Sequence, residues 1–432
     1  MTRGHTAPGS ATADVVVCGS GVAGLAAACA LGRLGLDVTL LEKKKRQPPV
    51  AKGEILQPGS LDTLQEWGVL PALEARGAVR LKRLVARQAD GAELLAMDFG
   101  TLRCAWPWML SHDHTTILEC LAESLGASVR WRRGVLVRDV LTDAHGRVVG
   151  VRAADGAHGY DIRARLVVAA DGMSSRLRRL AGMTADPVAY GHKLLTLELS
   201  GTAARADEAS AYLTERGLVL VYPLPDGRTR VYVQVKADEL RKADHTRLQR
   251  WCDELLAAVP ALDPLAVLVK DSLDRRQLLP VWRYRAPSLV RPGIVLVGEA
   301  AHGVHPLAAQ GMNTAIGDAR ALAARLATVH VREEATLDDA MRAYEAERMS
   351  RIRDIHFMSH DAARLMTGTS PGVRMLNRHL LVRTAKSARL RYLTTYNVSG
   401  VGMRPLGAVD RLVQLGVLPA RGRLPRPGPA PE

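Results

Sequence analysis

The chain has 432 residues, a net charge of +15, 47% hydrophobic residues and 24% charged residues. This composition is ordinary for a soluble globular protein, and the chain is long enough to bury a large core. The five cysteines contain no CxxC pair, so neither a disulfide framework nor a metal site is indicated. No nucleic-acid-binding motif accompanies the positive charge, so we expect no nucleic-acid partner.

The first segment with a clear pattern predicts a nucleotide-binding unit. A β-rich run at 14–18 leads into a GxGxxG loop, an apolar helix at 25–34 and a second strand at 38–41, which ends at Glu42. Such glycines allow a tight turn and the close approach of a pyrophosphate, and an acid about twenty residues further on binds a ribose hydroxyl. A transmembrane helix is the alternative, because residues 15–32 carry no charge. The predicted nucleotide contacts are Gly19, Gly21, Val22, Ala23, Gly24, Glu42 and Lys43.

Further β patterns follow in the middle of the chain. Residues 129–151 are typical of a β meander with a turn at 143–146. Residues 165–170 form a buried-strand pattern that ends at Asp171 and Gly172, and a short basic helix follows. Spacing alone predicts only a strand, a turn and a capped helix here.

The segment 298–313 is the most informative part of the sequence. A buried strand pattern at 294–297 runs into Glu299, and a turn marked by Gly and Pro then leads to a helix predicted to begin near Asn313. A carboxylate accepts strong hydrogen bonds from the hydroxyls of a ribityl-like chain. A helix start preceded by Gly311 offers free backbone N–H groups to an electron-rich ring. One strand-turn-helix unit can thus hold a sugar-like chain at one end and a ring at the other.

In this order, the three elements resemble the class A flavoprotein monooxygenases, the superfamily of para-hydroxybenzoate hydroxylase and squalene monooxygenase. That family uses a GxGxxG for the ADP half of FAD, a mid-chain Asp-Gly near the pyrophosphate, and a late GDAAH-x-x-x-P…GxN motif for the ribityl chain and flavin ring. The chain departs at Glu299, where the family usually has Asp. The segment 53–59, GEILQPG, resembles the family segment beside the flavin. The resemblance therefore implies FAD contacts at Gly53, Glu54, Gln57, Asp171, Gly172, Glu299, Pro306, Gly311, Met312 and Asn313.

The resemblance also bears on the histidines and on catalysis. A family helix that begins beside the flavin corresponds to 115–125 here, with His112 and His114 at its start where an Arg is common. Either imidazole can approach the ribityl chain or pyrophosphate, and we take His114 as the candidate; an exposed capping histidine is the alternative. The cofactor carries the chemistry, so no catalytic residue is assigned. The pocket candidates are Tyr222, His305 and Pro306.

The predicted fold class is α/β. A Rossmann-like FAD-binding domain is interleaved with an α+β substrate domain built on a mostly antiparallel sheet, and a helical C-terminal extension follows. A strong hairpin signal at 218–222 and 231–235 fits the sheet floor that the family would supply. The predicted boundaries are a disordered lead at 1–13, the FAD-binding domain at 14–80, 106–185 and 285–350, the substrate domain at 81–105 and 186–284, the extension at 351–420 and a disordered tail at 421–432.

By resemblance, NADPH or NADH reduces FAD, and O2 then gives a 4a-hydroperoxyflavin that hydroxylates or epoxidises the substrate. We expect a tailoring enzyme of secondary metabolism acting on a bulky hydrophobic molecule of aromatic polyketide or terpenoid type. An FAD-dependent reductase of isoprenoid double bonds is the main alternative, and a flavin-dependent halogenase is a further one. Both share the FAD motifs with the monooxygenases.

Basic residues gather between 374 and 404, with apolar residues among them. They form either a solvated helix face or a peripheral membrane surface that collects a hydrophobic substrate. The first dozen residues lack the apolar stretch of a signal peptide. We therefore expect a cytoplasmic protein, with membrane-peripheral contact under the second interpretation.

Overall fold

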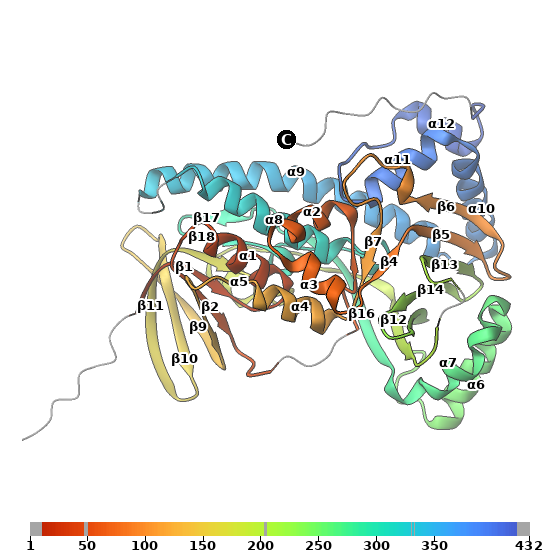
Figure 1. The fold of residues 1–432 in the computed structure, drawn as a ribbon, viewed down its shortest axis with the longest axis horizontal. Helices are drawn as coiled ribbons and strands as arrows, with labels where there is room; N and C mark the ends of the chain where they lie inside the picture. Colours follow the sequence, from red (N-terminus) through yellow and green to blue (C-terminus); the bar gives the residue numbers. More distant parts are fainter. Residues whose placement is uncertain (1–10, 47–50, 203–204, 330, 332, 421–432) are drawn as a thin grey trace, which may run out of the picture.

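The computed structural model describes residues 11–420 apart from 47–50, 203–204, 330 and 332. Two large sheets lie next to each other, and the long helix α9 (Glu334–Thr367) contacts strands of both (Figure 1). The predicted mixed α/β class is confirmed. The predicted tail and residues 1–10 of the predicted lead lie outside the described residues, whereas residues 11–13 already belong to the first strand.

The first sheet has the strand order β17-β18-β11-β1-β2-β8, and β10 and β9 extend it from β11. The central strands β18, β11, β1 and β2 pair in parallel with their neighbours. Parallel pairing is expected for strands whose sequences are continuous apolar runs. The sheet comprises β1 (Ala11–Cys18), β2 (Val38–Glu42), β8 (Val129–Arg133), β9 (Val135–Thr142), β10 (Val148–Asp155), β11 (His158–Ala169), β17 (Val290–Arg291) and β18 (Ile294–Leu296).

The predicted meander at 129–151 is wrong in its first strand. β8 pairs in parallel with β2, and only β9 and β10 form the expected hairpin around the turn at Asp143. The pairing of β8 with β2 places Val129 against Gly32, where a Cβ would come within 2.6 Å of the valine side chain. Packing of β8 against the helix at Val22–Gly32 and its pairing with β2 therefore take precedence over its sequence proximity to β9.

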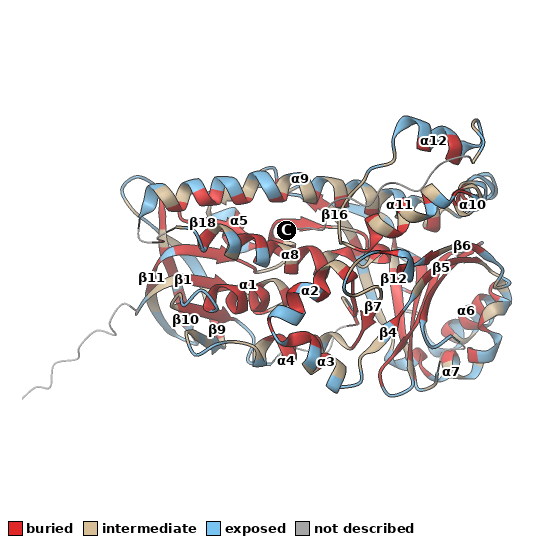
Figure 2. Ribbon diagram, turned by 45° about the horizontal axis from the view of Figure 1, so that its top comes forward, coloured by how far each residue is buried: buried red, intermediate tan, exposed pale blue. Residues whose placement is uncertain are grey.

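Helix α1 (Val22–Gly32) is buried on nearly all sides, because it lies between the first sheet, α4 (His114–Glu123) and α8 (Gln310–Leu326) (Figure 2). This enclosure explains its uncharged sequence, since a helix that is apolar all round must be covered on every face. Across the described ranges, no helix has both the length and the apolarity needed to cross a bilayer.

The second sheet has the order β19-β16-β12-β15-β14-β13-β5-β6, and its pairs are antiparallel except β13 with β5. The predicted hairpin is confirmed as β14 and β15. Helices α6 (His245–Ala258) and α7 (Ala266–Asp271) cover one face. The strands are β5 (Arg83–Gln88), β6 (Glu93–Asp98), β12 (Val188–Leu199), β13 (Glu208–Thr214), β14 (Gly217–Leu224), β15 (Arg228–Lys236), β16 (Gln277–Arg285) and β19 (His302–Gly303).

Smaller elements join the two sheets and close the fold. A three-stranded antiparallel sheet lies between them, and short α-helices and 3-10 helices flank it along the chain. These elements are β3 (Ile55–Leu56), β4 (Val79–Leu81), β7 (Met109–Ser111), α2 (Pro58–Glu66), α3 (Val69–Ala75), α5 (Arg176–Leu180), and the 3-10 helices η1 (Phe99–Thr101), η2 (Pro260–Leu265), η3 (Leu273–Arg275), η4 (Gly298–Ala300) and η5 (Pro306–Ala308).

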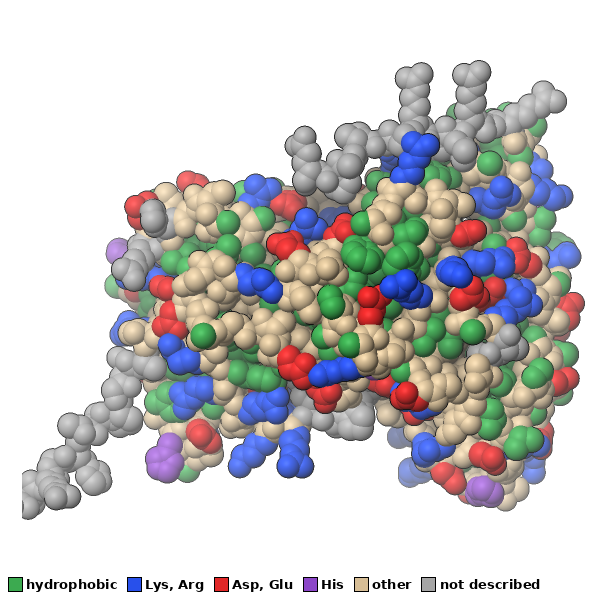
Figure 3. Space-filling model, in the orientation of Figure 1, with side chains coloured by type: hydrophobic (Ala, Val, Ile, Leu, Met, Phe, Trp, Pro, Cys, Tyr) green, Lys and Arg blue, Asp and Glu red, His purple; other side chains and the backbone are tan. Residues whose placement is uncertain are grey.

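Beyond α9, the predicted C-terminal extension consists of α10 (Pro371–Lys386), α11 (Ala388–Val398) and α12 (Ala408–Leu415). Helices α10 and α11 pack on β6, α10 also contacts α9, and α12 packs on α10. Some of the extension's basic side chains are paired within the protein: Arg389 contacts Asp410 at 2.7 Å. On the face in Figure 3, basic side chains are interspersed with acidic ones. The predicted membrane contact stays a prediction.

Candidate functional site

A cavity of about 250 Å³, here called the central cavity, lies where the first sheet's loops meet the second sheet. Its wall on the second sheet is apolar, formed by Leu194, Leu218, Leu220 and Leu279, and the opposite wall consists of loops and helix starts. Segments far apart in the sequence therefore converge on one space. The predicted site residues that line it are Gly21, Val22, Ala23, Gly53, Glu54, His114, Gly172, Tyr222, Glu299, Pro306, Gly311 and Met312.

The three glycines of the GxGxxG loop have different roles. A Cβ at Gly24 would lie 1.7 Å from the Gly19 carbonyl oxygen, and a Cβ at Gly19 would lie 2.4 Å from that of Ala170. Gly19 and Gly24 thus allow helix and strand to pack, and neither lines the cavity. Gly21 has no atom within 4 Å of its Cβ position, and it precedes α1 without a side-chain cap. The free N–H groups of that helix start suit a phosphate.

Glu42 holds the glycine loop in place at the end of β2. Its carboxylate accepts hydrogen bonds from the Ser20 N–H at 2.9 Å, the Ser20 hydroxyl at 3.2 Å and the Lys44 N–H at 2.9 Å. Glu42 is buried behind the cavity wall, so its predicted bond to a ribose hydroxyl stays a prediction. Lys43 is exposed and does not line the cavity.

The two residues of the Asp-Gly motif after β11 have different roles. The Asp171 carboxylate accepts hydrogen bonds from the Ser175 hydroxyl at 2.5 Å and from the Arg176 N–H at 2.7 Å, so it holds the start of α5. The predicted cap of this helix is present as Ser175, whose side chain accepts from the Arg178 N–H. Gly172 has a φ of +84°, which favours glycine, and it has open space at its Cβ position beside the cavity. Gly172, and not the Asp171 side chain, therefore faces the ligand space.

The late turn presents a second uncapped helix start to the cavity. Helix α8 begins at Gln310, three residues before the predicted start at Asn313. Its N-cap, Ala309, has a φ of +50° and provides no side-chain cap. Gly311 has no atom within 4 Å of its Cβ position. The first N–H groups of α8 are therefore free to bind an electron-rich ring edge.

Asn313 and Gln57 support this turn from behind the cavity wall. The Asn313 side chain donates to the Ile55 carbonyl at 3.0 Å and accepts from the Gln57 N–H at 2.8 Å. These bonds join the segment after Gly53 to the first turn of α8. Both residues were predicted as FAD contacts, but their side chains lie outside the central cavity, so direct contact stays a prediction.

A buried charge cluster, which the sequence analysis missed, positions Glu299. The Asp318 carboxylate accepts hydrogen bonds from the Gly298 N–H at 2.9 Å, His302 Nε2 at 2.7 Å and Arg348 Nε at 2.8 Å. Burial alone would raise the pKa of Asp318, but the charges of Arg348 and His302 outweigh it and lower the pKa. The cluster fixes both ends of η4, so it sets where the Glu299 carboxylate lies.

Glu299 itself forms an ion pair with Lys52 at the edge of the cavity. Both side chains are nearly half exposed, at 44% for Glu299 and 49% for Lys52. Lys52 was not predicted, because a single lysine in a loop carries no spacing signal. A cation and an anion that face one another here can both contact the polar part of a dinucleotide.

Two tyrosines of the second sheet bind the segment that carries Lys52. The Tyr222 hydroxyl donates to Glu54 Oε2 at 2.7 Å, and the Tyr232 hydroxyl donates to the Ala51 carbonyl at 3.0 Å. Arg230 completes the contact with two hydrogen bonds to Glu54, at 2.7 and 2.9 Å. Glu54 thus lines the cavity, but its carboxylate is engaged by the second sheet.

The two candidate histidines differ in position. His114 Nδ1 donates to the Gly53 carbonyl at 3.2 Å, and burial lowers its pKa, so the ring is neutral and presents Nε2 as an acceptor. His305 does not line the cavity; its Nδ1 accepts from the Leu307 N–H at 3.1 Å and its Nε2 lies 3.0 Å from His192 Nε2. His305 therefore holds the turn that carries Pro306 rather than contacting the ligand space.

This arrangement fits FAD. Two uncapped helix starts border one cavity, and open space lies beside three glycines, Gly21, Gly172 and Gly311. A pyrophosphate suits the start of α1 and a flavin ring suits the start of α8, with polar groups such as Glu299 between them. Among the described residues, no group of His, Cys, Asp and Glu gathers in a way that could hold a metal ion.

Comparison with known proteins agrees with this geometry. A family model described as an FAD binding domain matches residues 12–357. The 6-methylpretetramide 4-monooxygenase of Streptomyces rimosus is 32% identical over 328 residues, which are 73% of this chain and 76% of that enzyme. Squalene monooxygenase of Mus musculus is 24% identical over 310 residues, 71% of this chain and 53% of that enzyme.

A solved structure gives the same result for the fold. The crystal structure of PqsL, a probable FAD-dependent monooxygenase from Pseudomonas aeruginosa, has a TM-score of 0.75 and 25% sequence identity, and the match covers 84% of this chain and 100% of that one. Fold, cavity and sequence relatives therefore agree, and the chain belongs to the family of class A FAD-dependent monooxygenases.

Proposed function

We propose that this enzyme uses NAD(P)H and O2 to hydroxylate an aromatic ring within a bulky hydrophobic substrate of the polyketide type. One observation carries the proposal: the leucine wall of the second sheet faces the uncapped start of α8 across the central cavity. The relative from Streptomyces rimosus, named as a monooxygenase of 6-methylpretetramide, supports the substrate class. Epoxidation of a terpenoid is the second candidate, favoured by the likeness to squalene monooxygenase.

Bound FAD, reduced by NAD(P)H, would supply electrons and activate oxygen for transfer. The protein's first contribution is electrostatic, because the N–H groups at the start of α8 stabilise negative charge that develops on a ring beside Gly311. Such a helix-terminus effect is worth about 0.3–1 kcal/mol when exposed and more when water is excluded. Glu299 and Lys52 would hold the polar chain of the cofactor, and Gly21 would admit its pyrophosphate.

The second contribution is the exclusion of water. Leu194, Leu218 and Leu220 present only hydrocarbon to the cavity, so an activated oxygen species beside them is protected from solvent. Tyr222 contributes no base, because burial raises the pKa of its phenol well above the usual value and its proton is donated to Glu54. The route of oxygen activation given above stays a prediction.

The proposal is tested with purified, FAD-loaded enzyme and a panel of phenols and fused-ring polyketides under 18O2. We expect NADPH oxidation that the substrate stimulates, an equal uptake of oxygen, and one 18O atom in the product. NADPH loss without oxygen uptake would instead indicate a reductase of double bonds. A product that contains chlorine only when chloride is present would indicate a halogenase.

A further inference from the structure

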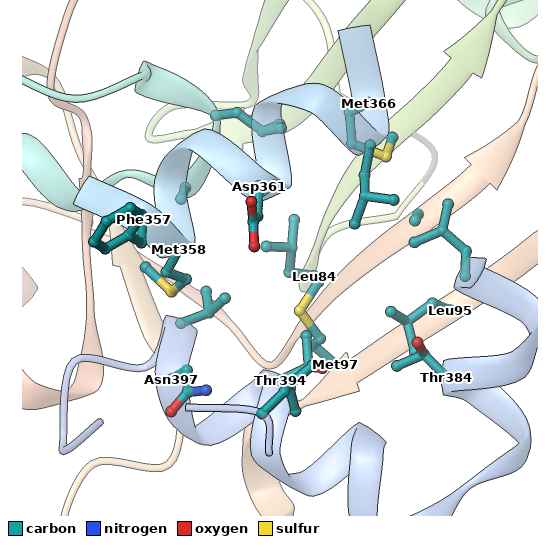
Figure 4. Close-up of a pocket in the computed structure, with 18 of the residues that line it drawn as sticks. Leu84, Leu95, Met97, Phe357, Met358, Asp361, Met366, Thr384, Thr394 and Asn397 are labelled. Carbon is teal, nitrogen blue, oxygen red and sulfur yellow. The ribbon is translucent and has the colours of Figure 1, made fainter. Parts of the chain in front are cut away.

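A second cavity, of about 380 Å³, lies between the second sheet, α9 and the C-terminal extension, and we call it the distal chamber. In Figure 4, Met358 and Met366 project from α9 on one side, while Leu95 and Met97 lie on the other. Helices α10 to α12 lie beyond residue 357, where the match to the FAD binding domain ends. The chamber therefore depends on a part of the chain that the cofactor-binding unit does not include.

The walls of the distal chamber are chemically apolar. Three of its polar side chains are bonded within the protein: the Thr384 hydroxyl donates to the Leu380 carbonyl at 2.8 Å, the Gln414 amide donates to Thr384 at 3.0 Å, and the Asn397 amide donates to the Arg404 carbonyl at 2.9 Å. These bonds leave mainly hydrocarbon and thioether surface toward the space. Flexible methionine side chains adapt to varied apolar ligands. The lining methionines are Met97, Met358, Met366 and Met403.

Each charged side chain that lines the chamber has a partner of opposite charge. Arg411 of α12 donates to Asp361 of α9 at 3.0 Å and to Gln414 at 3.2 Å, and Asp354 pairs with Arg353 at 3.5 Å. Because these charges are paired, the chamber attracts neither anions nor cations strongly. A neutral ligand fits this chamber better than a charged one.

The distal chamber adjoins the central cavity. Leu307 lines both spaces, Pro306 and Ala309 line the central cavity, and Ala308 lines the chamber. The short turn η5 is therefore the partition between them. A molecule whose reacting ring lies beside the flavin in the central cavity can extend past Leu307 into the chamber.

We propose that the distal chamber binds the apolar part of an extended substrate, a neutral hydrocarbon chain or ring system attached to the ring that reacts. This inference rests on the proposed function, because the reacting ring must lie in the central cavity. Two observations support it: the shared Leu307 and a volume within the range of about 300–1,000 Å³ that is usual for small-molecule pockets. An apolar space of this size that stayed empty would also forfeit packing contacts along its whole lining.

The test is the binding of 4-alkylphenols of increasing chain length to the FAD-loaded protein, measured by isothermal titration calorimetry. Each buried methylene is expected to tighten Kd about fourfold, until the chamber is filled and Kd levels off. Binding is measured without NADPH, so the result does not depend on turnover. A Kd that does not change with chain length would overturn the proposal.

Variants locate the binding site. Ala86→Phe fills the chamber from β5, since Ala86 lines it and is only 4% exposed. Ala96→Phe, on the neighbouring strand and outside the chamber lining, is the matched control. We expect Ala86→Phe to weaken 4-octylphenol binding at least tenfold while phenol binding and FAD content stay unchanged, and we expect the control to bind both ligands as the wild type does. Ala362→Trp, from α9, is a second blocking variant should Ala86→Phe not fold.

Measuring oxygen incorporation into the same phenols distinguishes a failure of this proposal from a failure of the proposed function. If long alkylphenols bind with the expected dependence but no oxygen is incorporated, the chamber assignment stands and aromatic hydroxylation fails. If phenol is hydroxylated but neither chain length nor the blocking variants change Kd, the chamber assignment fails and the proposed function stands.

Discussion

A single methyl group added at Gly311 tests whether the flavin ring lies against the start of α8. Gly311 is the second residue of that helix, its Cβ position has no atom within 4 Å, and it lines the central cavity. Gly372 is the second residue of α10, has the same open space, and is distant from the cavity lining. Gly311→Ala and Gly372→Ala are therefore a matched pair that differs in proximity to the cofactor.

The two effects of Gly311→Ala have opposite signs. Replacing glycine with alanine in a helix stabilises the apoprotein by roughly 0.5–1 kcal/mol, and we expect this for both variants. A methyl group forced into a packed site costs about 1–3 kcal/mol, which corresponds to a Kd for FAD raised about 5- to 150-fold in Gly311→Ala alone. Urea unfolding of the apoproteins gives the first quantity, and quenching of flavin fluorescence on titration gives the second.

Unchanged FAD affinity in Gly311→Ala would refute the placement of the ring beside this helix start. A similar loss of affinity in Gly372→Ala would show that the effect arises from general destabilisation and not from contact. Loss of apoprotein stability in Gly311→Ala would contradict the open space described at that position.

Three further predictions follow from the site. Glu299→Ala is expected to lower FAD occupancy while far-UV circular dichroism stays unchanged, and full occupancy would exclude the ribityl role. Asp318→Asn removes the charge partner of a buried guanidinium and is expected to lower the free energy of unfolding by about 3–5 kcal/mol; a loss below about 1 kcal/mol in urea unfolding would contradict this. Burial lowers the pKa of His305 to about 3, whereas the unfolded chain protonates it near about 6.5, so stability is lost as pH falls from about 6.5 toward 3. His305→Asn is expected to flatten that loss between about pH 7 and pH 5, and an unchanged slope of unfolding free energy against pH would refute it.

Short sequence patterns predicted the elements whose backbone conformation is determined by the residues of the pattern itself. The GxGxxG loop requires glycines because a Cβ at Gly24 or Gly19 would clash with backbone, and this constraint is readable from spacing. The hairpin of β14 and β15 was readable because two strands rich in β-branched and apolar residues flank a turn in which Asp226 and Gly227 adopt positive φ. In the hairpin and at Gly24 the deciding contacts lie within a few residues of the pattern, whereas the contact at Gly19 is with Ala170, which is distant in the sequence.

Features that depend on distant contacts were not predictable from one sequence. The early start of α8 follows from Ala309 at a φ of +50°, and alanine is not a residue that signals a helix cap. The bonds between Asn313 and Gln57 connect positions 256 residues apart, so their structural role has no local signature. Asp318 carried a weak signal, an acid within the apolar pattern of a helix, but its partner Arg348 lies on another helix.

The most direct test of this account is a crystal structure of the protein with FAD bound. We expect the pyrophosphate at the start of α1 beside Gly21, the ribityl chain near Glu299 and the isoalloxazine ring against Gly311 and Met312. A flavin bound outside the central cavity, or a ring that contacts neither helix start, would contradict the account.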